Sequence, residues 1–128
     1  MSVVLNHAIV ACRDQQRLAA FLTEILGLPA ATRFGRFLVA ATDNGVSLDF
    51  DETDAEIATQ HYAFLIGEDE FDVIFGRIAG RDVPYWADPG RTRPGEINRN
   101  DSRRGVYFAD PDGHLMEVIT RPYGSGNS

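Results

Sequence analysis

The sequence runs twice through the same order of predicted elements: a strand, a helix and three further strands. The first copy is expected over residues 1–51 and the second over residues 60–123, with an acidic linker at 52–59 and a tail at 124–128. Two such modules in one chain predict a single α+β domain, 1–128, of two βαβββ modules that form a half-open curved sheet around a cleft, with the helices outside.

The pattern of apolar residues places each element. In the first module, Asp14 is a plausible helix N-cap and Gly27 a helix stop, and in the second Gly80 is the expected stop. The predicted helices carry apolar residues at helical spacing, whereas the predicted strands are short, apolar and separated by turn residues. The expected strands are 2–12, 32–34, 37–41, 46–51, 61–66, 83–86 and a final hairpin within 106–120, and the second helix is 69–79.

The final hairpin carries a carboxylate in the middle of an apolar strand. Its turn, Asp-Pro-Asp-Gly at 110–113, combines a residue that presets φ with one that accepts positive φ. Glu117 follows on the strand, and an unpaired buried carboxylate would cost several kcal/mol. Glu117 therefore needs a cation, a metal ion or a proton.

The repeat extends to individual polar residues. His7 lies in the first strand of module one and His61 in the first strand of module two. Asp49 follows a turn glycine by four residues, as Glu117 does. Two imidazoles and a carboxylate that converge, with open positions left over, are what a catalytic divalent metal requires. We expect His7, His61 and Glu117 to be ligands, and Asp49, with its shorter side chain, to be a fourth ligand or to lie just behind the ligands.

Other residues have two interpretations each. Tyr107 can reach the open side of the metal or be an ordinary strand tyrosine, and Trp86 can line a pocket or belong to the core. A long insert at 87–104 contains five arginines, among them Arg99 and Arg103, which could bind an anionic substrate or serve only solubility. His114 lies on the opposite strand face from Glu117, which favours a structural role.

Composition excludes several classes of partner. The chain has 128 residues, 44% of them hydrophobic, and a net charge of −7, which argues against nucleic acid and membrane surfaces. It has no lysine, so arginine or histidine must bind any anion that a side chain holds. The single cysteine, Cys12, and the lack of an apolar span or signal peptide predict a cytoplasmic protein.

Three runs of residues, LNHAIV, HYAFLI and YFADPDGHLMEV, together with the paired modules, make the chain similar to the vicinal oxygen chelate superfamily. This superfamily contains glyoxalases, bleomycin-binding proteins, dioxygenases and fosfomycin-resistance thiol transferases, and the motifs resemble the last branch most. The resemblance implies a metal held by His7, His61 and Glu117, a substrate contact at Tyr107, and a homodimer. The chain differs from that branch at Ile9, where a threonine is expected, and at 98–105, where a potassium-binding loop is expected.

The function expected from residues and resemblance is that of a metalloenzyme. A divalent ion (Fe, Mn, Zn, Ni or Co) would chelate a small oxygen-bearing substrate, with Tyr107 as the catalytic side chain and Trp86, Arg99 and Arg103 as substrate contacts. The alternative is a metal-free drug-binding protein of the bleomycin type. A metal retained for structure alone is a third possibility.

Overall fold

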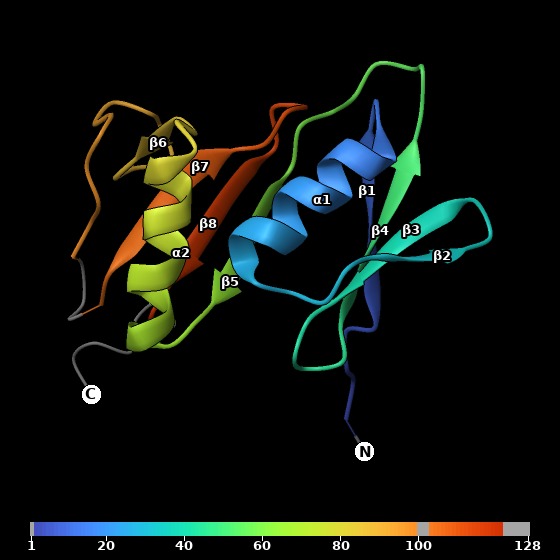
Figure 1. Cartoon of the computed structure of the whole chain (residues 1–128), viewed down its shortest axis with the longest axis horizontal. Coiled ribbons are helices and arrows are strands. Elements are labelled where there is room, and N and C mark those ends of the chain that lie inside the picture. The colour runs from blue at the N-terminus through green and yellow to red at the C-terminus, as the bar shows by residue number, and fades with distance from the viewer. Residues whose placement is uncertain (1, 100–102, 122–128) are drawn as a thin grey trace. The chain divides into compact units, whose positions relative to one another are not determined.

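The computed structural model describes residues 2–99 and 103–121. The chain divides into two units, Met1–Ala58 and Thr59–Ser128. The first unit contains β1 (His7–Cys12), α1 (Gln15–Leu26), β2 (Thr32–Phe34), β3 (Phe37–Ala41) and β4 (Ser47–Glu52). The second contains β5 (His61–Leu65), α2 (Glu68–Gly80), β6 (Tyr85–Trp86), β7 (Gly105–Ala109) and β8 (Leu115–Ile119) (Figure 1). The expected α+β class and the two βαβββ modules are confirmed.

Each unit forms an open four-stranded sheet of the same topology. The strand order is β1-β4-β3-β2 in the first unit and β5-β8-β7-β6 in the second. The first strand of each unit pairs in parallel with the last, and the remaining pairs are antiparallel. A parallel pair needs a crossover connection, which the helix of each unit supplies.

The first helix begins and ends at the residues that the sequence predicts. Asp14 has an extended backbone, and its carboxylate accepts a hydrogen bond from the Arg17 backbone N–H at 3.1 Å. Gly27 closes the helix with a φ of 72°. Buried side chains on one face of α1 join those of β1, β3 and β4 in the core of the unit, and these include Val10, Leu18, Leu22, Ile25, Ala40 and Phe50.

The second helix ends at Gly80, as predicted, but Gly80 is not a left-handed stop residue. Gly80 belongs to α2, and the left-handed residue is Asp82, with a φ of 56°. The Val83 N–H turns back to the carbonyl of Ile78 at 3.1 Å, and Pro84 has no N–H to give to a sheet. The strand expected at 83–86 is therefore reduced to Tyr85 and Trp86.

The first predicted strand is too long at its N-terminal end. The expected strand 2–12 begins at His7, because its partner β4 begins at Ser47 and the turn before Ser47 offers no further backbone to pair with. The last contact is from the Ser47 N–H to the Asn6 carbonyl, at 3.0 Å. The apolar side chains before it, Val3, Val4 and Leu5, are exposed.

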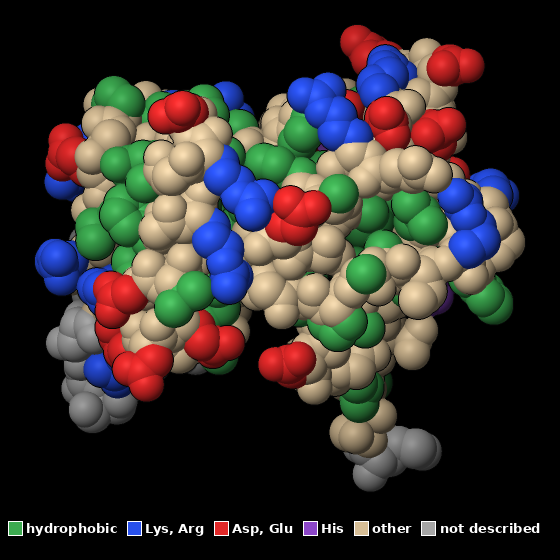
Figure 2. Space-filling view, viewed as in Figure 1, with side chains coloured by type: hydrophobic (Ala, Val, Ile, Leu, Met, Phe, Trp, Pro, Cys, Tyr) green, Lys and Arg blue, Asp and Glu red, His purple; other side chains and the backbone are tan. Residues whose placement is uncertain are grey.

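One arginine fixes α2 to the start of β7. The Arg104 guanidinium contacts Glu68 at 2.9 Å and Asp72 at 2.7 Å, and its carbon lies 4.4 Å from the centroid of the Phe71 ring. On the face shown in Figure 2, arginines and carboxylates lie side by side in this way rather than in separate patches. No helix in the described residues is long and apolar enough to cross a membrane.

Replacing Arg104 with methionine should lower the urea midpoint of unfolding by about 0.5 M at neutral pH, because the cation–π contact and both ion pairs are lost. A hydrogen bond from Thr120, and then Arg104, lowers the pKa of Glu68, and Arg104 lowers the pKa of Asp72. Carboxyls with lowered pKa values stabilise the fold above their ordinary values of 4.5 and 3.8, and this is lost as the pH falls through the lowered values.

The difference between R104M and the wild type should therefore shrink as the pH falls below 3.8. Urea titrations at several pH values measure it. The matched control is R93M, because Arg93 forms its ion pair with the exposed Glu96 and not with α2. A difference that stays constant with pH would show that the ion pairs contribute nothing and that only packing is lost.

Candidate functional site

The turn of the last hairpin sets the position of Glu117. The carboxylate of Asp110 accepts hydrogen bonds from the backbone N–H groups of Asp112 (2.9 Å) and His114 (2.8 Å), and Gly113 has a φ of 89°. Burial raises the pKa of Asp110, although the N–H donors oppose the shift. The turn starts β8 in a register that places Glu117 opposite Tyr107 on one side and Ala63 on the other.

Glu117 and His61 meet across the parallel pair of β5 and β8. His61 Nε2 lies 3.0 Å from Glu117 Oε1, and the Glu117 side chain is fully buried while the imidazole is 45% exposed. His61 Nδ1 lies 3.1 Å from the carbonyl oxygen of Leu115. A carbonyl can only accept, so Nδ1 carries a proton, and Nε2 faces the carboxylate.

This arrangement requires a positive charge between the two side chains. A neutral imidazole with a protonated Nδ1 would direct the lone pair of Nε2 at a carboxylate oxygen, which is repulsive. A proton on Nε2 or a metal ion between the two atoms removes the repulsion. Two ligands at right angles, each about 2.1 Å from a metal ion, lie about 3 Å apart. The pair therefore fits a divalent ion, and the Nδ1 contact is the kind that orients a metal-binding histidine.

Tyr107 and Trp86 lie on the same sheet face as Glu117. Trp86 pairs with Tyr107 and Tyr107 with Glu117, and directly opposed residues point to the same side of a sheet. The rings of His61 and Tyr107 stack with centroids 5.8 Å apart. Helix α2 covers the other face, because its Phe75 packs edge-on against Tyr85 with 5.1 Å between the centroids. The face with the polar residues is thus not the helix-covered one.

His7 and Asp49 lie in the first unit and share one face of its sheet. His7 pairs with Ser47, and Ile9 pairs with Asp49. His7 is exposed, with Nδ1 2.7 Å from the side-chain oxygen of Asn6. Asp49 is 9% exposed and accepts a hydrogen bond from the Ser47 hydroxyl at 2.9 Å. Within residues 2–99 and 103–121, no group of three or more His, Cys, Asp or Glu side chains gathers as a metal cluster.

The register explains why the two modules match. His7 stands opposite Ser47, two residues before Asp49, and His61 stands opposite Leu115, two residues before Glu117. The relative positions of histidine and carboxylate that the sequence repeat suggests are therefore the same in the strand register of the two units. Of the predicted ligands, the structure brings His61 and Glu117 together, whereas His7 and Asp49 belong to the other unit.

The insert after Trp86 is more ordered than the structureless loop that the sequence predicts. Asp88 accepts hydrogen bonds from the backbone and hydroxyl of Thr92 and from the Arg93 N–H. Isolated bridges join Trp86 to Pro94 and Asn98 to Gly105. Of the two predicted substrate arginines, Arg99 is exposed and Arg103 is 5% exposed. Residues 100–102 of the insert lie outside the described residues.

His114 has the structural role that its strand face predicts. It is fully buried, and its Nδ1 accepts a hydrogen bond from the Gln60 N–H at 3.0 Å. Its ring meets Tyr62 edge-on with centroids 5.9 Å apart. These contacts fix the strand before Glu117.

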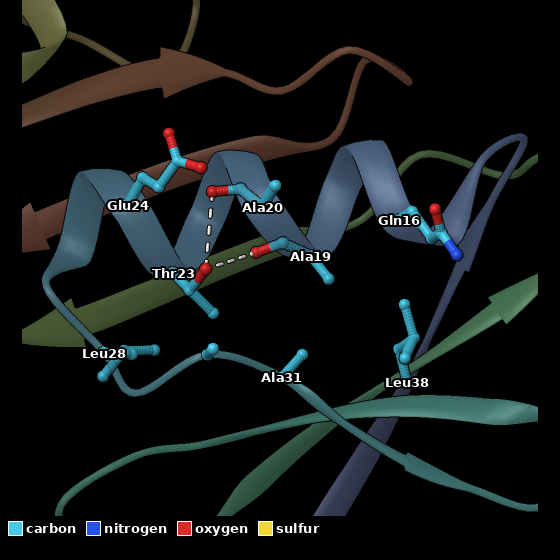
Figure 3. Close-up of a pocket in the computed structure, with 9 residues that line it drawn as sticks. Gln16, Ala19, Ala20, Thr23, Glu24, Leu28, Ala31 and Leu38 are labelled. Carbon is cyan, nitrogen blue, oxygen red and sulfur yellow. Dashed lines mark hydrogen bonds between the residues drawn. The ribbon is translucent and has the colours of Figure 1, made fainter.

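A groove of about 450 Å³ lies in the first unit, between α1 and the segment 28–31 (Figure 3). Its wall on the helix is formed largely by small side chains, and the Thr23 hydroxyl there donates to the Ala19 carbonyl at 2.8 Å. None of the predicted site residues lines this groove. It is a feature of the helix side, whereas His7 and Asp49 lie on the other sheet face.

The chain resembles known proteins over nearly all of its length. Residues 4–118 match the model of the Glyoxalase/Bleomycin resistance protein/Dioxygenase superfamily. It is 31% identical to a glutathione transferase FosA of Serratia marcescens, over 89% of this chain and 78% of the relative. It is 28% identical to a metallothiol transferase FosB of Lysinibacillus sphaericus (strain C3-41), over 91% of this chain and 81% of the relative.

Among solved structures, it is similar to one described as oxidase ChaP-H1. The identity is 57%, the coverage is 96% of this chain and 99% of that chain, and the TM-score is 0.94. These relatives are enzymes, so the prediction of an enzyme is confirmed at the level of the family. The chain belongs to the glyoxalase/bleomycin resistance protein/dioxygenase superfamily, as the residues of its two modules predict.

Proposed function

We propose that this protein is a divalent-metal-dependent oxidase that acts on a small substrate with adjacent oxygen atoms. The observation that carries the proposal is the pair His61–Glu117, in which the imidazole is oriented by the Leu115 carbonyl and its free nitrogen faces a buried carboxylate 3.0 Å away. A divalent ion between the two side chains would balance the charge of the carboxylate and would keep further coordination positions for a substrate.

The proposed ligands are His7, His61 and Glu117. His7 is included because it takes the same place in β1 that His61 takes in β5, and its imidazole is exposed and available. Asp49 takes the place of Glu117 but is one carbon shorter and already accepts a hydrogen bond from Ser47. Two histidines and one carboxylate suit Fe, Mn, Zn, Ni or Co, with Asp49 as a fourth ligand or a partner of the ligands.

When bound, the ion would supply Lewis acidity for the chelated oxygens of the substrate and, as iron, electron transfer to dioxygen. The Tyr107 hydroxyl is proposed to hydrogen-bond the substrate, because its ring stacks on His61 and its strand position adjoins Glu117. Trp86 continues the same row, and Arg99 and Arg103 are proposed to contact the substrate from the insert. Because Glu117 is fully buried, water would not reach a bound ion from the side of this carboxylate.

Oxidation is preferred to thiol transfer for two reasons. The solved structure described as an oxidase is 57% identical to this chain, whereas the FosA and FosB relatives are 31% and 28% identical. The sequence also lacks the threonine at Ile9 and the potassium-binding loop at 98–105 that the fosfomycin-resistance branch has. Thiol transfer remains the second candidate because the curated relatives carry that description. A metal-free drug-binding protein is disfavoured because the buried carboxylate of Glu117 faces His61 in an arrangement that fits a metal ion.

We further propose a homodimer. Strands β1 and β5 are each at the edge of their sheet, and each exposes an apolar side chain: Ile9 is 52% exposed and Leu65 is 61% exposed. Unpaired edges with apolar side chains are a common site for another chain. Light scattering of the purified protein measures the mass of the assembly directly.

The cytoplasmic location stays a prediction from composition.

Glu117→Gln should lower the affinity for divalent metal by more than about 100-fold, because it removes the anionic ligand without changing its size. Calorimetry with Mn²⁺ and Zn²⁺ on metal-stripped protein measures this, with circular dichroism to show that the variant is folded. The matched control is Glu56→Gln at an exposed carboxylate of the linker, which should bind as the wild type does. Wild-type protein that binds no divalent ion would refute the metal site.

The oxidase proposal is tested by dioxygen uptake. Protein reconstituted with Fe²⁺ or Mn²⁺ should consume dioxygen with at least one member of a panel of catechols and enediols, and E117Q should be slower by about 100-fold or more. The same preparations are assayed for addition of glutathione to fosfomycin. A glutathione adduct without dioxygen uptake would replace the oxidase proposal with thiol transfer.

A further inference from the structure

Three side chains form a row across the sheet of the second unit, and an arginine side chain lies beside one end of this row. Trp86, Tyr107 and Glu117 are directly opposed residues of β6, β7 and β8, and therefore point to one face. Adjacent strands are about 4.8 Å apart, so Trp86 stands about 10 Å from Glu117 along the row. This distance is the length of a flat bicyclic molecule.

Arg91 lies at the far end of the row. Its guanidinium carbon is 4.8 Å from the centroid of the Trp86 ring, a cation–π geometry. Its backbone has a φ of 61°, a left-handed conformation that is unfavourable for a non-glycine residue. The turn that holds it is closed by the Arg91 N–H, which donates to the Asp88 carbonyl at 3.2 Å. The loop thus maintains an unfavourable backbone conformation at the residue that stacks on Trp86.

The segment that carries Arg91 is fastened at both of its ends. The Ala87 N–H donates to the Arg93 carbonyl at 3.1 Å, and the Gly95 N–H donates to the Tyr85 carbonyl at 3.0 Å. The Asn98 amide donates to the Ala87 carbonyl at 2.9 Å. A fastened loop holds its cation in place before any ligand arrives, which reduces the entropy lost on binding.

The Arg91 guanidinium has hydrogen-bonding capacity left for a ligand. Within residues 2–99 and 103–121, no carboxylate lies within ion-pair distance of it, whereas Arg93 pairs with Glu96 and Arg104 with Glu68. The protein has no lysine, so arginines are its only permanently charged side-chain cations. A guanidinium stacked on an aromatic ring still presents its N–H groups in the plane, where an anion can accept them.

We propose that Trp86 and Arg91 form a subsite for the distal end of the substrate, so that the substrate is a flat, unsaturated molecule with an acidic group on the side remote from its chelating oxygens. The flat body lies along Tyr107 and Trp86, and the acidic group accepts hydrogen bonds from Arg91. This subsite deepens the proposed function and rests on it for the position of the chelated oxygens.

The test uses two dyes of the same shape, 2,3-dihydroxynaphthalene and its 6-sulfonate, with protein loaded with redox-inert Zn²⁺. Trp86 is the only tryptophan, so the change in tryptophan fluorescence on binding comes from this one residue. The wild type should bind the sulfonate about five times more tightly. Arg91→Gln should abolish that ratio without weakening the unsulfonated compound, Arg91→Lys should keep part of it, and Arg93→Gln, a neighbour in the loop, should keep all of it.

The outcomes separate this subsite from the metal site. A ratio that persists in metal-stripped protein, with both affinities reduced, supports the subsite and the chelation together. Equal affinities in the wild type, or a ratio unchanged in Arg91→Gln, overturn the subsite but leave the metal site intact. Absence of binding of either dye to zinc-loaded protein overturns the subsite as well, and calorimetry with Zn²⁺ alone shows whether the metal site has failed with it.

Discussion

The buried carboxylate of Glu117 is the constraint on which the second unit depends. A carboxylate with no exposed surface needs a cation, a metal ion or a proton to balance its charge, and one oxygen of Glu117 lies 3.0 Å from Nε2 of His61. Holding the two residues together requires the parallel pairing of β5 and β8, and that pairing requires the crossover helix α2. Strands β5 and β8 and helix α2 therefore together place the imidazole of His61 beside the carboxylate of Glu117.

Much of this could be predicted from the sequence, because the repeat and the turn residues act locally. The α1 cap at Asp14 and the stop at Gly27 depend on neighbours within one helical turn. The turn at 110–113 depends on its own four residues, and it sets the face of every residue on β8. A period of two along the strand then separates Glu117 from His114, which explains why their different roles could be predicted.

Other features depend on residues that lie outside the local pattern. The start of β1 is decided by where β4 begins, which no pattern within 2–12 records. At the end of α2 the left-handed residue is Asp82 and not Gly80, and the Val83 N–H bonds back to the Ile78 carbonyl, which the position of the glycine alone does not reveal. Arg104 was one of five similar arginines in the insert, and only the position of α2 distinguishes it. The Arg91–Trp86 stack could not be predicted either, because nothing in the sequence distinguishes Arg91 from the other arginines of the insert.

The two modules keep the same frame and differ in how each holds its histidine. His61 is oriented by a backbone carbonyl, which cannot rotate, whereas His7 is oriented by the side chain of Asn6, which can. The equivalent carboxylates differ as well: Glu117 is fully buried and reaches its imidazole, while Asp49 is shorter and bonded to Ser47. The second module therefore holds its histidine and carboxylate rigidly, whereas the histidine of the first module can reorient together with the side chain of Asn6.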